Sequence, residues 1–250
     1  MTSTPPPDAY YADPRLAACY DTIDGSREDL DHYMAIADEL GARTVVDLGC
    51  GTGSLAVRLA TAGRQVIGVD PAGASLDLAR AKERALPPGA RPITWVEGDA
   101  TAIGPQHADL AVMIGNVAQV FTTDESWATT LRALRAALRP GGHLVFESRR
   151  PAARAWERWQ AEGREQRHEV PGIGTVLTRP RGITVDLPRV TFTDEFVLPD
   201  GTVLTSTSTL RFRDEAELRS SVAAAGFEVL EVREAPDRPG LEHVVIARAA

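Results

Sequence analysis

The chain has 250 residues, of which 43% are hydrophobic and 25% charged, and its formal net charge is -8. This length suits one large α/β domain with a small addition. The acidic balance argues against a general DNA- or RNA-binding surface, which requires basic patches. No apolar run approaches the roughly 18 residues that a membrane-spanning helix needs, so no membrane partner is expected.

The first residues predict a flexible tail over 1–14, because three prolines at 5–7 interrupt any regular structure. This segment has neither a basic stretch nor an apolar run, so we expect no signal peptide and a cytoplasmic location. Cys19 and Cys50 are interpreted as reduced thiols rather than as a disulfide. A helical pattern then extends from Leu16 to Leu40.

The stretch Val45–Gly53 joins an apolar strand to three alternating glycines, and a helical pattern follows from Ser54. Gly49 allows a tight turn, and Gly51 lets a ligand approach the backbone. Gly53 lets the helix pack closely on the strand. A dinucleotide-binding loop would place glycine at position 54, where this chain has serine.

Three predicted strands end at or near an acidic residue. Asp47 lies at the end of the first strand, Asp70 follows the second at 65–69, and Asp99 follows the third at 93–96. An acidic residue about 20 positions beyond the glycines can bind both ribose hydroxyls. Carboxylates together would repel a pyrophosphate and attract a cation. Taken singly, each aspartate has an alternative interpretation as a helix cap or a solvated turn.

This order of residues resembles the first motifs of class I S-adenosylmethionine (SAM) methyltransferases, whose glycine loop is written D-x-G-x-G-x-G. The resemblance covers roughly 40–150 and 211–249, and it implies SAM as the cofactor. In the family, the acid after strand two binds ribose and the aspartate after strand three binds the adenine amino group, and these roles fall on Asp70 and Asp99. The other positions that the resemblance implies at the SAM site are Tyr20, Asp47, Gly49, Cys50, Gly51, Gly53, Pro71, Ala100, Gly115 and Asn116. Tyr33 is a further tyrosine of the kind that closes over the methionine carboxylate in small-molecule members.

Strand and helix patterns alternate from Thr44 to Phe146 and resume after residue 213. The predicted fold is therefore α/β: a doubly wound, mostly parallel seven-stranded sheet with an antiparallel last strand. Short β-rich pieces over 169–212 predict a small inserted antiparallel β-sheet. The expected organisation is a SAM-binding core over 15–168, the insertion, and the end of the core over 213–250. The insertion would serve either as a lid over the acceptor or as a contact in a homodimer.

Methyl transfer from SAM is a direct displacement, so the protein mainly aligns the reactants and excludes water. Asn116, after the fourth strand, would contact the acceptor or form an Asx turn. His168 borders the insertion and is the best candidate for a general base, if the acceptor requires one. Glu147 ends the fifth strand and Arg149 follows it. Both would hold an acceptor, although Arg149 opens an arginine cluster that also suits a solvated helix face. No histidine has a metal-ligand spacing, so no metal is expected.

These patterns predict a SAM-dependent methyltransferase that modifies an oxygen or nitrogen of a small-molecule acceptor. The stretch Gly115–Phe121 lacks the Asp/Asn-Pro-Pro-Tyr tetrad of many members that methylate nucleic acids or protein amides. The alternatives are a SAM-binding cyclase or rearrangement enzyme of the same fold, and a non-catalytic SAM-binding protein. An NAD or nucleotide-sugar enzyme is disfavoured by Ser54.

Overall fold

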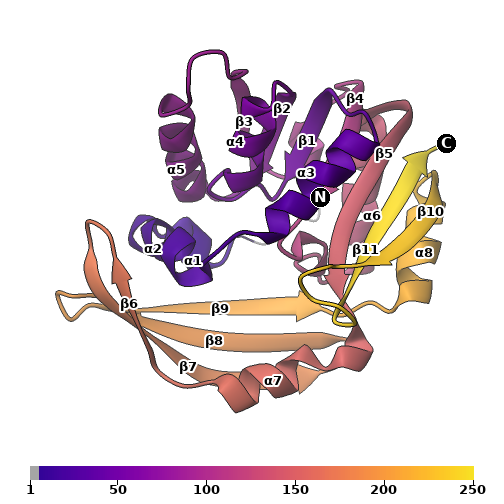
Figure 1. The fold of residues 1–250 in the computed structure, drawn as a ribbon. Helices are drawn as coiled ribbons and strands as arrows, with labels where there is room; N and C mark the ends of the chain where they lie inside the picture. The colour runs from indigo at the N-terminus through magenta and orange to yellow at the C-terminus, as the bar shows by residue number, and fades with distance from the viewer. Residues whose placement is uncertain (1–5) are drawn as a thin grey trace.

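A computed structural model describes residues 6–250. Its core is a seven-stranded sheet in which the antiparallel β11 is inserted between β5 and β10 (Figure 1). The other neighbours, β3 to β2 to β1 to β4 to β5, pair in parallel, which confirms the predicted fold class. In spatial order the strands are β10 (Phe227–Glu234), β11 (Glu242–Ala249), β5 (Leu138–Arg149), β4 (Ala108–Met113), β1 (Thr44–Leu48), β2 (Gln65–Asp70) and β3 (Ile93–Glu97).

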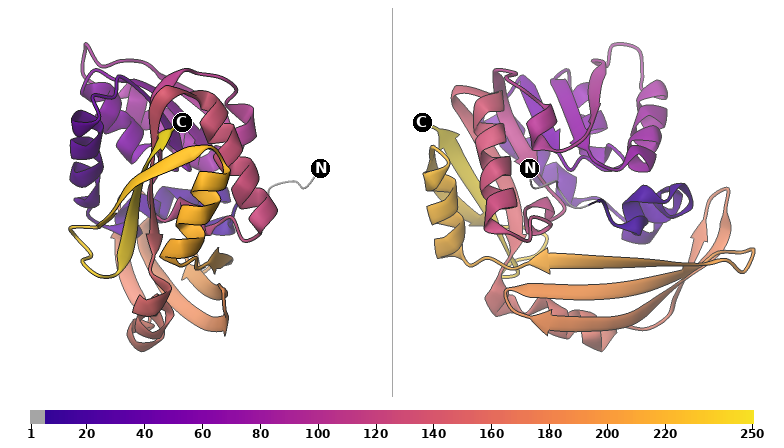
Figure 2. Two further views of the ribbon diagram at one scale, coloured as in Figure 1. Left: turned by 90° about the vertical axis from the view of Figure 1, so that its right-hand side faces the viewer. Right: turned by 180° about the vertical axis from the view of Figure 1, so that it is seen from behind.

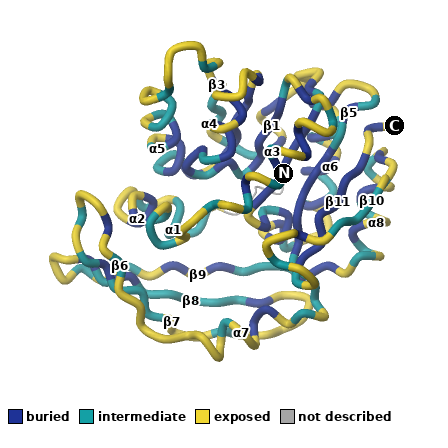
Figure 3. Tube along the Cα trace, in the orientation of Figure 1, coloured by how far each residue is buried: buried dark blue, intermediate teal, exposed yellow. Residues whose placement is uncertain are grey.

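Helices cover both faces of this sheet (Figure 2). On one face lie α3 (Asp29–Glu39), α4 (Ser54–Thr61) and α5 (Gly73–Arg84). On the other face lie α6 (Asp124–Ala137) and α8 (Glu215–Ala224). Strands that are buried on both faces require nearly continuous apolar sequence, and runs such as Val45-Val46 supply it. The tube in Figure 3 is accordingly dark blue along the central strands.

The inserted segment forms a separate antiparallel sheet in the order β6-β7-β8-β9. Its strands are β6 (Gln166–Val170), β7 (Gly174–Asp186), β8 (Arg189–Val197) and β9 (Val203–Arg211). Two of the short β-rich pieces within 169–212, namely 175–178 and 183–187, lie along the single long strand β7 and the turn after it. Cross-strand threonine pairs stabilise the sheet, for example Thr191 with Thr209 at 2.9 Å between hydroxyls. Short elements link the sheet to the core: η3 (Pro151–Ala153) and α7 (Ala155–Glu162).

The N-terminal segment lies between the two sheets (Figures 1 and 2). The part of the predicted tail at 6–14 is structured and contains the short helix α1 (Ala9–Ala12), whereas residues 1–5 lie outside the described residues. Tyr10 of α1 stacks on Phe196 of β8 with 4.9 Å between ring centroids, and this contact stabilises so short a helix. The single helix predicted over 16–40 is instead two, α2 (Pro14–Asp24) and α3, because Gly25 adopts a φ of 80°.

Candidate active site

A cavity of 480 Å³ opens at the carboxyl ends of β1, β2, β3 and β4, where ligands bind in doubly wound sheets. We call it the SAM cleft. Ten residues expected at the cofactor site line it: Tyr20, Asp47, Gly49, Cys50, Gly51, Asp70, Pro71, Asp99, Ala100 and Gly115. Residues that sequence reasoning missed also line it, above all Tyr11 and Arg27.

The glycine loop owes its shape to left-handed backbone at alternate positions. Gly49 has a φ of 73°, and a Cβ there would lie 2.4 Å from Cγ2 of Val117. Gly51 has a φ of 52°, and a Cβ there would meet no atom of residues 6–250 within 4 Å, so this backbone is open to a ligand. Gly53 does not line the cleft. A Cβ there would lie 2.8 Å from both Ala79 and Trp95, so Gly53 serves the packing of α4.

The carboxylates of the cleft differ in their hydrogen bonds. Asp70 accepts the amide hydrogens of Gly51 and Ala72, each at 2.8 Å, and thereby ties the glycine loop to the turn after β2. Asp47 is 1% exposed, and among residues 6–250 neither of its side-chain oxygens accepts a hydrogen bond. Burial, together with the nearby charge of Asp70, raises the pKa of Asp47 to about 7. Such a group is paired most favourably with a cation.

The N-terminal helices cover the cleft. Tyr20 of α2 and Tyr11 beside it line the cavity, and their rings lie 5.7 Å apart. Arg27 lines the same cavity and is held by two hydrogen bonds of 2.9 Å to the carboxylate of Asp29. The cleft therefore offers an acidic group at Asp47 and a fixed guanidinium at Arg27.

Asn116 and Glu147 do not line the cleft but meet in a buried network behind it. Asn116 has a φ of 62°, and its backbone N–H donates to Oε1 of Glu147 at 2.9 Å. Its side-chain amide donates to Oε1 of Glu242 at 3.0 Å. Tyr33 also donates to Glu147, so its hydroxyl is likewise turned away from the cleft. The structure thus gives Asn116, Glu147 and Tyr33 a supporting position rather than the expected contact with acceptor or SAM.

The arginines after β5 do not converge on an acceptor. Arg149 lies 5.2 Å from the ring centroid of Trp159 and donates to Oε1 of Gln119 at 3.1 Å. Arg150 pairs with Glu234, and Arg154 pairs with Glu157 on the surface. None of these arginines lines the SAM cleft.

A second cavity, of 290 Å³, lies between the N-terminal helices and the four-stranded sheet. We call it the chamber. Tyr10, Phe192 and Phe196 give it aromatic walls, and His168 lines it with its Nε2 3.1 Å from the hydroxyl of Thr178. Tyr11 lines both the chamber and the SAM cleft. The structure therefore separates His168 from the SAM cleft but places it in the adjoining cavity.

Two further findings concern residues 6–250. No group of three or more His, Cys, Asp or Glu side chains there is arranged to hold a metal ion. No helix in this part of the chain has both the length and the apolar character that crossing a membrane requires.

Comparison with known proteins places this site in a family. Residues 45–142 match a family model described as a methyltransferase domain. The chain is 30% identical over 201 residues to a cypemycin N-terminal methyltransferase from Streptomyces, and the match covers 76% of this chain and 74% of that protein. The chain belongs to the class I SAM-dependent methyltransferases. It is accordingly an enzyme, and SAM is the methyl donor of its family.

Solved structures share the fold of this methyltransferase. The CcbJ methyltransferase from Streptomyces caelestis has a TM-score of 0.72 at 23% identity, covering 94% of this chain and 96% of that chain. SAM-bound CalS10, an amino pentose methyltransferase from Micromonospora echinaspora, has a TM-score of 0.65 at 21% identity, covering 93% and 95%. A ubiquinone biosynthesis O-methyltransferase from Serratia proteamaculans is 32% identical over 130 residues, and the match spans 51% of each chain.

Proposed function

We propose that this methyltransferase transfers the methyl group of SAM to an amine nitrogen of a small-molecule acceptor, which lies in the chamber. One observation carries the proposal: Tyr11 lines both cavities, so the chamber adjoins the SAM cleft. The four-stranded sheet is the outer wall of the chamber, which favours its role as a lid over its role as a dimer contact.

The cleft offers a complementary partner for each part of SAM. Asp47 would face the ammonium of the methionine portion, and Arg27 would face its carboxylate. Asp70 would bind the ribose hydroxyls, because each of its oxygens has accepted only one backbone hydrogen bond and retains acceptor capacity. Asp99, beside Ala100, would receive the adenine amino group. SAM supplies an activated methyl group, and these residues hold and orient it.

The choice of an amine rests on relatives and on the chamber. The curated relative that matches three quarters of the chain is named for N-terminal methylation, and a neighbour of the same fold is titled an amino pentose methyltransferase. The O-methyltransferases that match do so over about half of their length.

A neutral amine has its own lone pair and attacks without prior loss of a proton. His168 is the imidazole of the chamber and is the candidate to accept the proton that the methylated ammonium then releases.

The test is incubation with SAM and matched panels of primary amines and alcohols, followed by mass spectrometry. We expect amine products that gain one methyl group, with one S-adenosylhomocysteine formed for each product. Methylation of alcohols but not of amines would contradict the nitrogen assignment. A product of unchanged mass would favour the rearrangement alternative, and SAM binding without turnover would favour a non-catalytic protein.

A further inference from the structure

Among the described residues that line the chamber there is one carboxylate, Asp194 on β8. Because side chains alternate along a strand, Phe192, Asp194 and Phe196 share the face that lines the chamber. Asp194 lies opposite Ser206 in the register of β8 and β9. Ser206 already accepts the backbone N–H of Tyr10 at 3.0 Å, so its position is fixed by the N-terminal segment.

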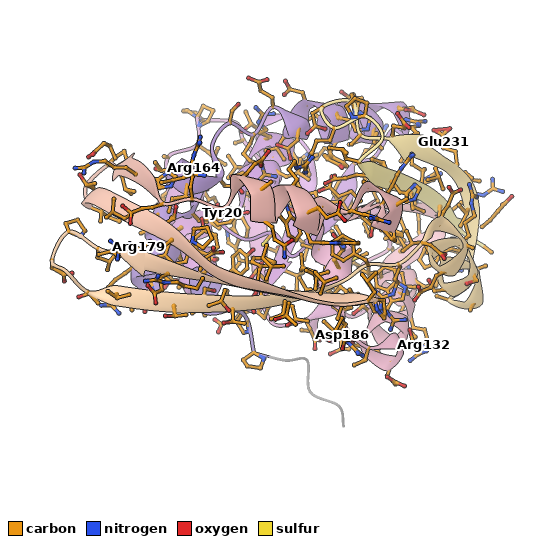
Figure 4. All side chains as sticks on the ribbon, turned by 90° about the horizontal axis from the view of Figure 1, so that it is seen from below. Tyr20, Arg132, Arg164, Arg179, Asp186 and Glu231 are labelled. Atoms are coloured by element: carbon orange, nitrogen blue, oxygen red, sulfur yellow. The ribbon has the colours of Figure 1, made fainter. Side chains whose placement is uncertain are left out.

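The carboxylate of Asp194 has no partner within residues 6–250: it makes neither a hydrogen bond nor an ion pair there. The adjacent Glu195, on the opposite face of the same strand, pairs with Arg181. Burial raises the pKa of Asp194, and no neighbouring group offsets this effect. Besides the tyrosines Tyr10 and Tyr11, the other ionisable groups that line the chamber are His168, which is bonded to Thr178, and the exposed Arg164. Arg164 lies toward the same end of the molecule as Tyr20 in the view from below (Figure 4).

Aromatic rings accompany this carboxylate. Tyr10 stacks on Phe196 with an interplanar angle of 20°, and Phe192 lies on the other side of Asp194 along β8. A carboxylate among aromatic rings suits an organic cation, because the carboxylate and the free faces of such rings carry negative potential. An alkylammonium group is such a cation: its charge suits the carboxylate, and its carbon atoms suit the aromatic rings.

The position of Asp194 indicates that the group it binds is not the nitrogen that is methylated. Asp194 lines the chamber but not the SAM cleft, and Tyr11 stands where the two cavities adjoin. A group seated on Asp194 is therefore removed from the methyl donor. A protonated amine held by a carboxylate would also lack the lone pair that the displacement needs.

We propose that Asp194 binds a second, positively charged group of the acceptor, an alkylammonium remote from the atom that is methylated. This inference rests on the proposed function, since it takes the chamber as the acceptor site. It assigns the acceptor to molecules that carry a cationic group in addition to the nucleophile. Asp194 is then a residue that determines specificity and takes no part in the displacement.

The test uses three probes of similar shape and different charge: benzylammonium, benzyl alcohol and benzoate. Each is titrated by NMR into the protein saturated with S-adenosylhomocysteine. We expect benzylammonium to bind most tightly and Asp194→Asn to weaken it by about ten- to a hundredfold, the range for a hydrogen bond to a charged group. Benzyl alcohol should respond little to this change. The matched control is Glu195→Gln, which removes a charge from the next residue on the opposite face and should leave all three affinities unchanged.

Benzoate binding as tightly as benzylammonium, or benzylammonium binding equally to wild type and Asp194→Asn, would overturn the inference. If Asp194→Asn does not fold, the comparison of the three probes on the wild-type protein still decides it, and Asp194→Glu should retain cation binding. The proposed function is judged separately by calorimetry with S-adenosylhomocysteine and by amine methylation. A protein that methylates amines but does not distinguish the probes refutes only the role of Asp194. Cation binding that depends on Asp194, in a protein that binds S-adenosylhomocysteine but methylates no amine, refutes the proposed function alone.

Discussion

The ionisation of Asp47 should control cofactor affinity near neutral pH. This side chain is 1% exposed, and burial raises its pKa from 3.8 to about 7. Below pH 7 the free enzyme therefore carries a protonated Asp47, and binding the ammonium of the cofactor requires that the proton be lost. Between pH 7.5 and pH 5.5 the ionised fraction falls by roughly 25-fold for a pKa of 7. We expect the Kd for S-adenosylhomocysteine to rise by about the same factor over this interval.

The assay is calorimetry across this pH range in buffers of different ionisation enthalpy, which also counts the protons released on binding. The matched variant is Asp47→Asn, which should bind more weakly and lose the pH dependence. Burial also raises the pKa of the neighbouring Asp70. If the Kd of Asp47→Asn still depended on pH, that dependence would be assigned to Asp70. A Kd that stays constant from pH 7.5 to pH 5.5 in the wild type would refute the reasoning outright.

The raised pKa of Asp47 also determines whether the free energy of unfolding rises or falls with pH. Because the pKa of Asp47 is higher in the folded than in the unfolded chain, the folded state binds more protons between pH 4 and pH 7. The free energy of unfolding of the ligand-free protein should therefore fall as pH rises through this window. The full change from 3.8 to about 7 corresponds to about 4 kcal/mol. Urea unfolding at several pH values should show a steeper slope in the wild type than in Asp47→Asn, which keeps only the contributions of other buried carboxyls such as Asp70.

Three other predictions follow from the contacts around the cleft. Glu147 accepts from Asn116 at one oxygen and from Tyr33 at the other, so Glu147→Gln sets its NH2 group against one of these donors; urea unfolding should show a loss of about 1–3 kcal/mol and calorimetry a weaker cofactor affinity. Gly53→Ala must fit a Cβ 2.8 Å from its neighbours at a φ of 80°, and it should lower stability by roughly 2–4 kcal/mol in urea unfolding. Lys82 binds the hydroxyl of Thr52 at 2.9 Å and pairs with a carboxylate of α2 at 2.7 Å. Calorimetry should therefore show Lys82→Met weakening cofactor binding by a few-fold, with stability nearly unchanged.

The sequence predicted those parts of the site whose geometry is local. Gly49 and Gly51 adopt a left-handed backbone. Glycines in a short loop between a strand and a helix are enough to predict this conformation, because it depends on only a few neighbouring residues. Asp70 could be predicted too, because its two hydrogen bonds reach only the adjoining turns. The mostly parallel sheet could be predicted for a similar reason, since alternating strands and helices leave few topologies.

Other parts of the site depend on tertiary placement that no local pattern records. Asn116 has the residue type of a turn, but its amide is directed to Glu242, 126 positions away in the chain. Arg27 and Tyr11 reach the cleft only because α1 and α2 lie over the carboxyl ends of the strands. The proline-rich start predicted a flexible tail, and the helix α1 within it depends on the inserted sheet for the ring of Phe196.

The N-terminal segment couples the two cavities, because the same few residues form a wall of each. Asp8 lines the SAM cleft and accepts a hydrogen bond from Ser208, which lines the chamber. Tyr11 lines both cavities, and its carbonyl accepts the hydroxyl of Ser75 on α5 at 2.9 Å. Moving this segment to exchange the cofactor would break contacts with β9 and with α5 at once. The enclosure that keeps water from the methyl donor and the shape of the acceptor chamber therefore depend on one set of contacts, made by residues 8–11.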